Sequence, residues 1–158
     1  MRMAQPMAWT LEDLDRLPDD GNKYEVLHGE LFVTPQPTLD HDTAIARLNQ
    51  LLVPFVVKEE LGMVFPGRPA IRTSDSHVEP DLVVRQVSPP KTRWEEAPLP
   101  LLVVEVLSST TKWRDRGPKR DFYVDELRVP DYWIVDTEKR SITVIRPGVA
   151  DFNVVDRF

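Results

Sequence analysis

Two stretches of the chain carry aliphatic side chains at almost every position, a pattern typical of strands that are buried on both faces. Residues 101–107 read LLVVEVL, and residues 81–87 begin with DLVV directly after a proline, which can open a strand because its missing N–H is not needed in the ladder. A loop of about a dozen residues joins them, so we expect the two strands to be antiparallel neighbours. The other short elements predicted are a helix beginning after Thr10, a hairpin over 24–33, and strands at 63–65, 70–72, 131–136, 141–146 and 152–155.

Two longer segments repeat apolar side chains every three to four positions, which predicts helices. The first covers residues 40–61, with a kink or short break expected at Pro54, where a backbone hydrogen bond is lost. The second covers residues 115–127, and its spacing puts Lys119 on the same face as Tyr123, toward the sheet. Lysine is seldom buried without a partner, so we expect an acidic group close to Lys119.

A carboxylate interrupts each of the two buried strands. Glu105 lies in the middle of residues 101–107, and Asp81 opens the neighbouring strand. Burying an ionised carboxylate alone is costly, so each needs a cation, hydrogen bonds or a raised pKa. Because Mg²⁺ and Mn²⁺ bind one or two carboxylates, backbone carbonyls and water, we expect a divalent metal site formed by Asp81, Glu105 and the carbonyl of Val106.

Such a site suits phosphodiester hydrolysis. A metal ion can activate water and polarise a phosphoryl oxygen, and an inward Lys119 would orient the water or offset charge on the phosphate. His41, in the first turn of the helix predicted at 40–61, would contact the metal-bound water or the substrate. An alternative stays open, because a buried acid paired with lysine is often only structural. Hairpin acids usually face water, which is the expectation for Glu25 and, from the residues alone, for Glu30.

Composition narrows the chemistry. The 158 residues suffice for one domain over 1–158, with 1–9 expected to be a flexible N-terminal arm. No cysteine is present, which excludes disulfides and thiolate ligands, and three scattered histidines argue against a multi-histidine metal site.

No apolar stretch approaches the roughly 20 residues that span a bilayer, and no signal peptide is recognisable. We therefore expect a cytoplasmic protein that does not enter a membrane.

The net charge of −6 is unusual for a protein that binds nucleic acid over a broad surface. Residues 112–120 nevertheless contain five basic residues and one acidic residue, directly after the Glu105 strand. A contact with DNA is therefore expected to be local, between Ser108 and Arg120. No phosphate-binding glycine loop, zinc-protease motif or serine-hydrolase motif competes with this interpretation.

Taken together, the motifs resemble a known family. In order, YEVLHGEL, His41 at a helix start, EPDLVV, LLVVEVLSSTT, RDRGPK and VPDYWIVD are similar to the Uma-two family of restriction-endonuclease-like proteins, in the PD-(D/E)XK nuclease superfamily. The resemblance runs over residues 10–146 and implies an α/β fold, in which helices flank a mixed sheet with an αβββαβ core, here with an N-terminal helix and hairpin. It also implies Mg²⁺-dependent phosphodiester cleavage, with Mn²⁺ as a substitute, and a homodimer.

The family motifs map onto residues already singled out. The PD pair falls on Pro80 and Asp81, and the acidic residue on Glu105. The superfamily lysine usually stands two positions after that glutamate, whereas the match here is Lys119 in the next helix. Glu30 and His41 match positions that border the site.

The sequence therefore predicts a Mg²⁺-dependent DNA endonuclease. Its catalytic set would be Asp81, Glu105, Lys119, Glu30 and His41. Two alternatives remain open. The acidic net charge and the displaced lysine favour a non-catalytic dimer that binds nucleic acid or protein on the same scaffold, and a metal-dependent hydrolase of smaller phosphate esters is the other.

Overall fold

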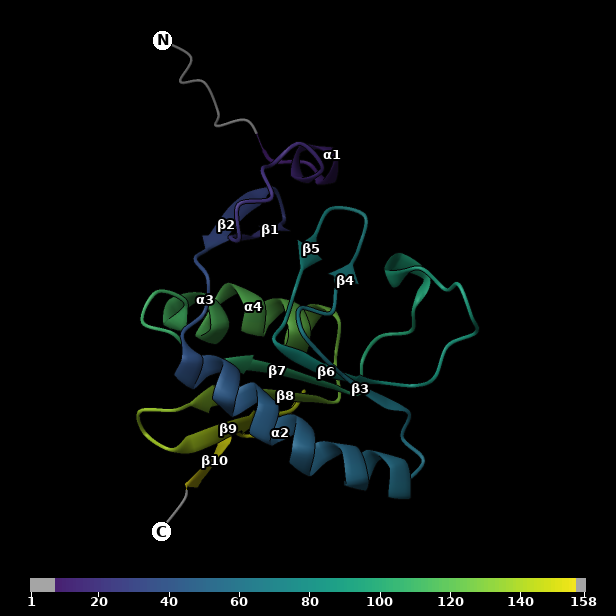
Figure 1. The fold of residues 1–158 in the computed structure, drawn as a ribbon, viewed down its shortest axis with the longest axis vertical. Coiled ribbons are helices and arrows are strands. Elements are labelled where there is room, and N and C mark those ends of the chain that lie inside the picture. Colours follow the sequence, from purple (N-terminus) through teal and green to yellow (C-terminus); the bar gives the residue numbers. More distant parts are fainter. Residues whose placement is uncertain (1–7, 156–158) are drawn as a thin grey trace.

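A six-stranded mixed sheet lies at the centre of the computed structural model, which describes residues 8–155 (Figure 1). Its strands, in spatial order, are β10 (Phe152–Val155), β9 (Ser141–Ile145), β8 (Asp131–Asp136), β7 (Leu102–Val106), β6 (Leu82–Arg85) and β3 (Met63–Pro66). β7 and β8 are parallel, and the other neighbouring pairs are antiparallel. The predicted α/β fold and the antiparallel pairing of the two buried strands are both confirmed.

A helical crossover joins β7 to β8, as parallel neighbours require. It consists of α3 (Lys112–Arg116), α4 (Pro118–Arg120) and a wider helical turn, η2 (Asp121–Glu126). Gly117 and Pro118 separate the first two parts, because proline lacks the N–H that a continuous helix would use. The helix predicted at 115–127 is therefore present but begins earlier, and Lys119 lies within it.

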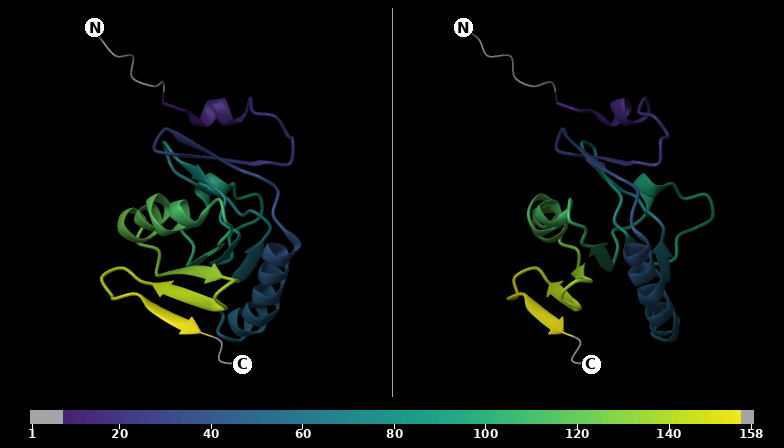
Figure 2. Two further views of the ribbon diagram at one scale, coloured as in Figure 1. Left: turned by 90° about the vertical axis from the view of Figure 1, so that its left-hand side faces the viewer. Right: turned by 60° about the vertical axis from the view of Figure 1, so that its left-hand side comes forward.

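A smaller sheet has the strand order β2 (Glu30–Thr34), β1 (Lys23–Leu27), β5 (His77–Val78) and β4 (Ile71–Arg72). Figure 2 shows β1 and β2 between the large sheet and the short helix α1 (Leu11–Leu14), which Thr10 caps as predicted. The turn residues of the β1–β2 hairpin, His28 and Gly29, have φ values of 49° and 82°. Two consecutive left-handed residues match a type I′ turn, whose twist suits a two-residue hairpin.

Helix α2 (Leu39–Lys58) continues through Pro54, so of the kink or short break expected there, the break is absent. Pro54 is exposed, so water can bond to the carbonyl that the proline leaves without a partner. The apolar arc of the helix is also wider than its contact with the sheet, because Leu51 and Phe55 are 74% and 55% exposed. A 3₁₀ turn, η1 (Trp94–Glu96), lies in the loop between β6 and β7.

The two faces of the large sheet pack against different partners. Leu82 and Val104 belong to a core shared with α2, whereas Val83 and Val103 belong to a core shared with the crossover and the smaller sheet. Because side chains alternate along a strand, Glu105 lies on the same face as Val103, beneath the crossover. Glu105 of β7 is thus directed toward the crossover, which carries Lys119.

Residues 1–7 of the predicted N-terminal arm lie outside the described residues. At the start of the described part, the N–H of Trp9 donates to the carbonyl of Gly29 at 2.8 Å. Within residues 8–155, no helix is both long enough and apolar enough to cross a membrane.

His28 connects the hairpin to two other segments. Its Nδ1 lies 2.8 Å from a carboxylate oxygen of Asp75, and its Nε2 lies 2.9 Å from one of Glu126. The hydrogen bonds to Asp75 and Glu126 raise the pKa of His28 above its ordinary value. A raised pKa in the folded state gives stability that is complete below the ordinary pKa of about 6.5 and is lost as the pH rises through the folded value.

We predict that His28→Asn, which keeps a residue tolerant of positive φ, lowers the free energy of unfolding more at pH 6 than at pH 9. Urea unfolding of the wild type and the variant at both pH values measures the difference. A gap that does not change with pH would contradict the prediction.

Candidate active site

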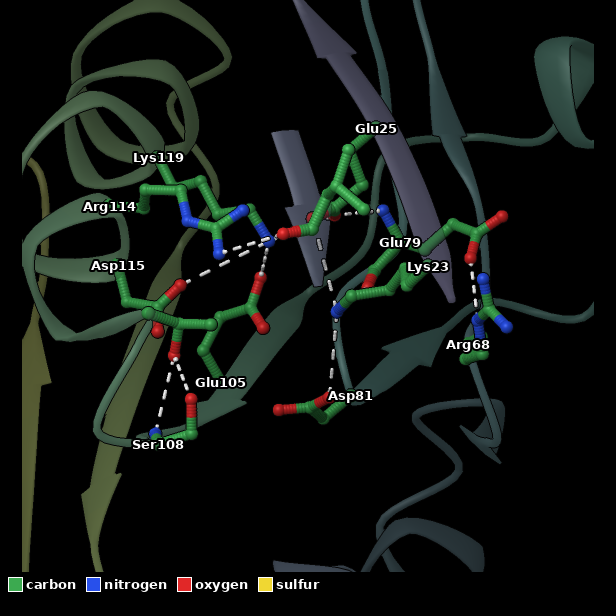
Figure 3. Close-up of polar contacts among 12 residues, drawn as sticks. Lys23, Glu25, Arg68, Glu79, Asp81, Glu105, Ser108, Arg114, Asp115 and Lys119 are labelled. Atoms are coloured by element: carbon green, nitrogen blue, oxygen red, sulfur yellow. Dashed lines mark hydrogen bonds and ion pairs between the residues drawn. The ribbon is translucent and has the colours of Figure 1, made fainter. Parts of the chain in front are cut away.

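Lys119 is the centre of a buried cluster of charged side chains (Figure 3). Its Nζ lies 2.8 Å from Oε1 of Glu105, 2.9 Å from Oε1 of Glu25 and 4.0 Å from Oδ1 of Asp115. Tyr123 donates its hydroxyl hydrogen to the same Glu105 oxygen at 3.1 Å. The prediction that Lys119 faces the sheet and meets an acidic group is confirmed.

Asp81 lies across from Glu105 on the same face of the sheet. The register pairs Leu82 with Val104, so the next step of this antiparallel ladder places Asp81 opposite Glu105. Oδ2 of Asp81 accepts the N–H of Val106 at 2.7 Å and lies 3.2 Å from Nε2 of His41, in the first turn of α2. The structure therefore brings Asp81, Glu105, Lys119 and His41 together, as predicted.

Glu25 is buried in this cluster, and the expectation that it faces water was wrong. Its Oε1 accepts the backbone N–H of Glu79 at 2.7 Å in addition to its contact with Lys119. Glu25 shares its strand face with Leu27, which belongs to the core. That alternation of an acid with a core leucine is the sequence signal that identifies Glu25 as an inward residue.

Lys23 is a second basic residue that the sequence reasoning missed. It lies on the same face of β1 as Glu25, and its Nζ is 4.0 Å from Oε2 of Glu25 and 3.8 Å from Oδ1 of Asp81. The Lys23 ammonium also donates to the backbone carbonyl of Glu79 at 2.9 Å. The sequence feature that identifies Lys23 is its position two residues before Glu25, because residues two apart in a strand lie on the same face.

Glu30 lies outside the site, and the prediction that it borders the site was wrong. It begins β2 next to the hairpin turn, is exposed, and does not line the cavity that the cluster forms. Glu25 and Glu30 share one face of the hairpin, because Glu25 pairs with Phe32 and Glu30 pairs with Leu27. Only the acid farther from the turn reaches the buried lysine.

The cluster has more acidic than basic groups. Four buried carboxylates surround two lysines: Glu25, Asp81, Glu105 and Asp115 face Lys23 and Lys119. Burial raises the pKa of Glu105 to about 8, and the charges of Asp115 and Asp81 add to this effect even though Lys119 opposes it. The excess of negative charge leaves one carboxylate incompletely compensated.

Asp81 and Lys119 keep their charges, whereas burial raises the pKa of Asp115 above its ordinary value. Burial raises the pKa of Asp81, but the hydrogen bond from His41 and the charge of Lys23 outweigh it and hold that pKa below its ordinary value. Burial lowers the pKa of Lys119, but the charges of Glu105 and Glu25 raise it well above its ordinary value. Lys119 is therefore protonated near neutral pH and acts as a fixed positive charge.

The cluster lines an open cavity of about 450 Å³. The loop after β7 forms one wall, where the N–H of Ser108 donates to the hydroxyl of Thr111 at 3.2 Å. Asp136, the last residue of β8, and Glu138 in the turn after it form another part of the rim. The cavity therefore opens at the ends of two neighbouring parallel strands.

The basic run at 112–120 is largely neutralised within the chain. Lys112 lies 2.8 Å from Glu138, Arg116 lies 3.9 Å from Asp136, and Arg120 lies 3.6 Å from Asp121 and from Asp125. The remaining members are Arg114, which is buried against the ring of Phe32, and Lys119 in the cluster. The predicted DNA contact between Ser108 and Arg120 is therefore a nearly charge-balanced surface.

The residues of the cavity fit a divalent cation. Oε2 of Glu25 is buried without a hydrogen-bond partner. Glu105 and Asp81 use Oε1 and Oδ2 for their hydrogen bonds, so the second oxygen of each accepts none from residues 8–155. No three His, Asp or Glu side chains of these residues form a complete ligand set, so an ion would keep several waters, as Mg²⁺ usually does. Asp81 and Glu105 would hold it, and the carbonyl of Val106 as a third ligand stays a prediction.

The raised pKa of Glu105 makes stability depend on pH. The pKa is about 8 in the folded protein against an ordinary value of 4.5, so the added stability is complete below 4.5 and is lost as the pH rises through about 8.

We predict that between pH 5 and pH 8 the wild type loses about 3 kcal/mol of unfolding free energy relative to Glu105→Gln, which cannot ionise. Urea unfolding in EDTA measures both proteins. Glu30→Gln is the control, because its side chain is exposed and its stability is expected to follow the wild type. A constant difference between the wild type and Glu105→Gln would refute the assignment of this ionisation.

Comparisons with known proteins agree with this fold. The model of the Uma2 family, described as "Putative restriction endonuclease", matches residues 11–155. A crystal structure from Anabaena variabilis, described as "a putative nuclease belonging to DUF820", is similar with a TM-score of 0.71 and 19% sequence identity, covering 94% of this chain and 85% of that one. No curated protein matches the chain. The chain therefore belongs to the Uma2 family and has a restriction-endonuclease-like fold.

Proposed function

We propose that this member of the Uma2 family is a divalent-metal-dependent endonuclease that hydrolyses phosphodiester bonds in DNA. The observation that carries the proposal is the buried Lys119, held between Glu105 and Glu25 at the floor of an open cavity. A salt bridge that served only stability would not need surplus carboxylates, since each uncompensated buried charge is costly. Such perturbed groups in a cleft are typical of sites that bind an ion or a substrate.

Lys119 has the role of a fixed positive charge. Two of its three N–H groups are used by Glu105 and Glu25, and the third has no hydrogen-bond partner among the described residues. A protonated amine in this position offsets the negative charge that develops on a phosphate during hydrolysis. Tyr123 fixes the position of the Glu105 carboxylate by its hydrogen bond.

Mg²⁺, or Mn²⁺ in its place, would be held by Asp81 and Glu105. When bound, the ion supplies an activated water and polarises a phosphoryl oxygen. His41 and the N–H of Val106 orient the Asp81 carboxylate through its Oδ2 atom. Burial lowers the pKa of His41, but the hydrogen bonds and negative charges of Asp81 and Asp42 together raise it above its ordinary value, which favours an imidazolium near the substrate phosphate.

DNA is the proposed substrate because the cavity is lined by groups that can donate hydrogen bonds to a phosphate backbone. The loop at 108–111 lines the cavity with hydroxyl groups, which suit contacts to phosphate oxygens. The nearly balanced charge of 112–120 suits a local contact rather than a broad one. Pairing of two copies, which the family resemblance implies, stays a prediction that sedimentation equilibrium tests.

Plasmid cleavage tests the proposal. We expect the wild type to nick or cut plasmid DNA with Mg²⁺ or Mn²⁺ and not in EDTA, and we expect Asp81→Asn and Lys119→Met each to reduce the rate about a hundredfold or more. Cleavage that persists unchanged in both variants would contradict the assignment of Asp81 and Lys119. Hydrolysis of small phosphate esters without plasmid cleavage would instead support the smaller-substrate alternative.

A matched pair of variants separates the two hairpin acids. Glu25→Gln should slow cleavage strongly, because Glu25 holds Lys119 in place. Glu30→Gln removes the same charge from the same hairpin at an exposed position and should leave the rate near that of the wild type. Equal effects of the two substitutions would argue against the position assigned to Glu25.

Binding of Mn²⁺ distinguishes the enzyme from a non-catalytic scaffold. Calorimetric titration should detect Mn²⁺ binding that Glu105→Ala weakens about tenfold or more. A protein that only binds nucleic acid or protein does not need this ion, so absence of Mn²⁺ binding by the wild type would favour that alternative.

A further inference from the structure

Arg68 occupies an unusual backbone position at the edge of the catalytic cavity. It lies in the turn between β3 and β4, where Gly67 has a φ of 82° and Arg68 a φ of 64°. A residue with a side chain rarely adopts this left-handed conformation, and strain of this kind is often kept where it places a functional group. The Arg68 side chain is half-exposed and lines the cavity.

Glu79 fixes the Arg68 side chain relative to the catalytic cluster. The Nε of Arg68 donates to Oε2 of Glu79 at 2.7 Å. The backbone of Glu79 is bonded to the cluster on both sides, because its N–H donates to Glu25 at 2.7 Å and its carbonyl accepts from Lys23 at 2.9 Å. Figure 3 shows this chain of contacts from Arg68 through Glu79 to Glu25.

Arg68 keeps the part of its guanidinium that binds phosphate. Only Nε donates to Glu79, and the two terminal nitrogens make no hydrogen bond or ion pair with residues 8–155. The basic residues of α3 and α4, in contrast, are mostly paired with acids or buried. In Figure 3, Arg68 lies on the opposite side of the cluster from Arg114 and Lys119.

Arg68 also stands between two cavities. Besides the catalytic cavity, it lines a second one of about 270 Å³, together with Arg72, which has no ion-pair partner among residues 8–155. Asp15 and Asp19 line this second cavity as well, and their negative charge would repel a phosphate, which leaves the catalytic cavity as the side on which Arg68 would bind one.

We propose that Arg68, held by Glu79, binds a backbone phosphate of the nucleic-acid substrate on the wall of the catalytic cavity opposite α3. This inference rests on the proposed nuclease function and names a substrate contact outside the acidic cluster. A strand bound in this way spans the cavity from the loop at 108–111 to Arg68, with the bond to be cleaved between the two contacts. The two terminal nitrogens of an arginine can donate two parallel hydrogen bonds to one phosphate, which the single ammonium of a lysine cannot do.

Arg68→Asn tests the contact, because asparagine tolerates the left-handed conformation and removes the charge. Binding of fluorescently labelled duplex DNA is measured by anisotropy in EDTA, over a series of salt concentrations. We expect the dissociation constant to rise roughly tenfold, and the slope of log affinity against log salt to fall by about one unit, as for the loss of one phosphate contact.

Arg128→Asn is the matched control. Arg128 is also an exposed arginine with positive φ, 53°, but it lines neither cavity. Thermal melts check that both variants are folded. Equal DNA affinity and salt slope in Arg68→Asn and the wild type would overturn the inference while leaving the nuclease proposal intact, and a wild type that does not bind DNA at all would overturn both.

Discussion

The buried ion cluster around Lys119 is the constraint on which the rest of the structure depends. Lys119 is 3% exposed and contacts Glu105 and Glu25, which come from two different sheets. An ammonium in this environment is tolerated only if carboxylates hold it at close range, and each carboxylate in turn needs the lysine. The larger sheet, the smaller sheet and the crossover are thus joined by one set of charges as well as by their apolar core.

The arrangement of secondary structure serves this cluster. The antiparallel register of β6 and β7 puts Asp81 across from Glu105, and the parallel step from β7 to β8 requires a crossover helix over that face. The smaller sheet then closes the third side with Lys23 and Glu25. The pleat directs Glu25, Asp81 and Glu105 to the same space, and the crossover supplies Lys119 and Asp115 from above it.

The charge of the cluster connects structure to the proposed chemistry. Four carboxylates and two lysines leave an excess of negative charge, and this excess contributes to the raised pKa of Glu105. A divalent cation would remove that excess and lower the cost of keeping the acids buried. In the proposed enzyme, the same imbalance that weakens the metal-free fold would provide affinity for the ion.

The sequence by itself determined the features that depend on local periodicity. Aliphatic runs identified β6 and β7 and their acids, and helical spacing turned Lys119 inward, because burial repeats every two or every three to four residues. Tertiary structure decided which distant groups meet. It selected Glu25 over Glu30, added Lys23, and paired the basic run with Glu138 and Asp136. These choices depend on the packing of segments far apart in the chain, which no local pattern records.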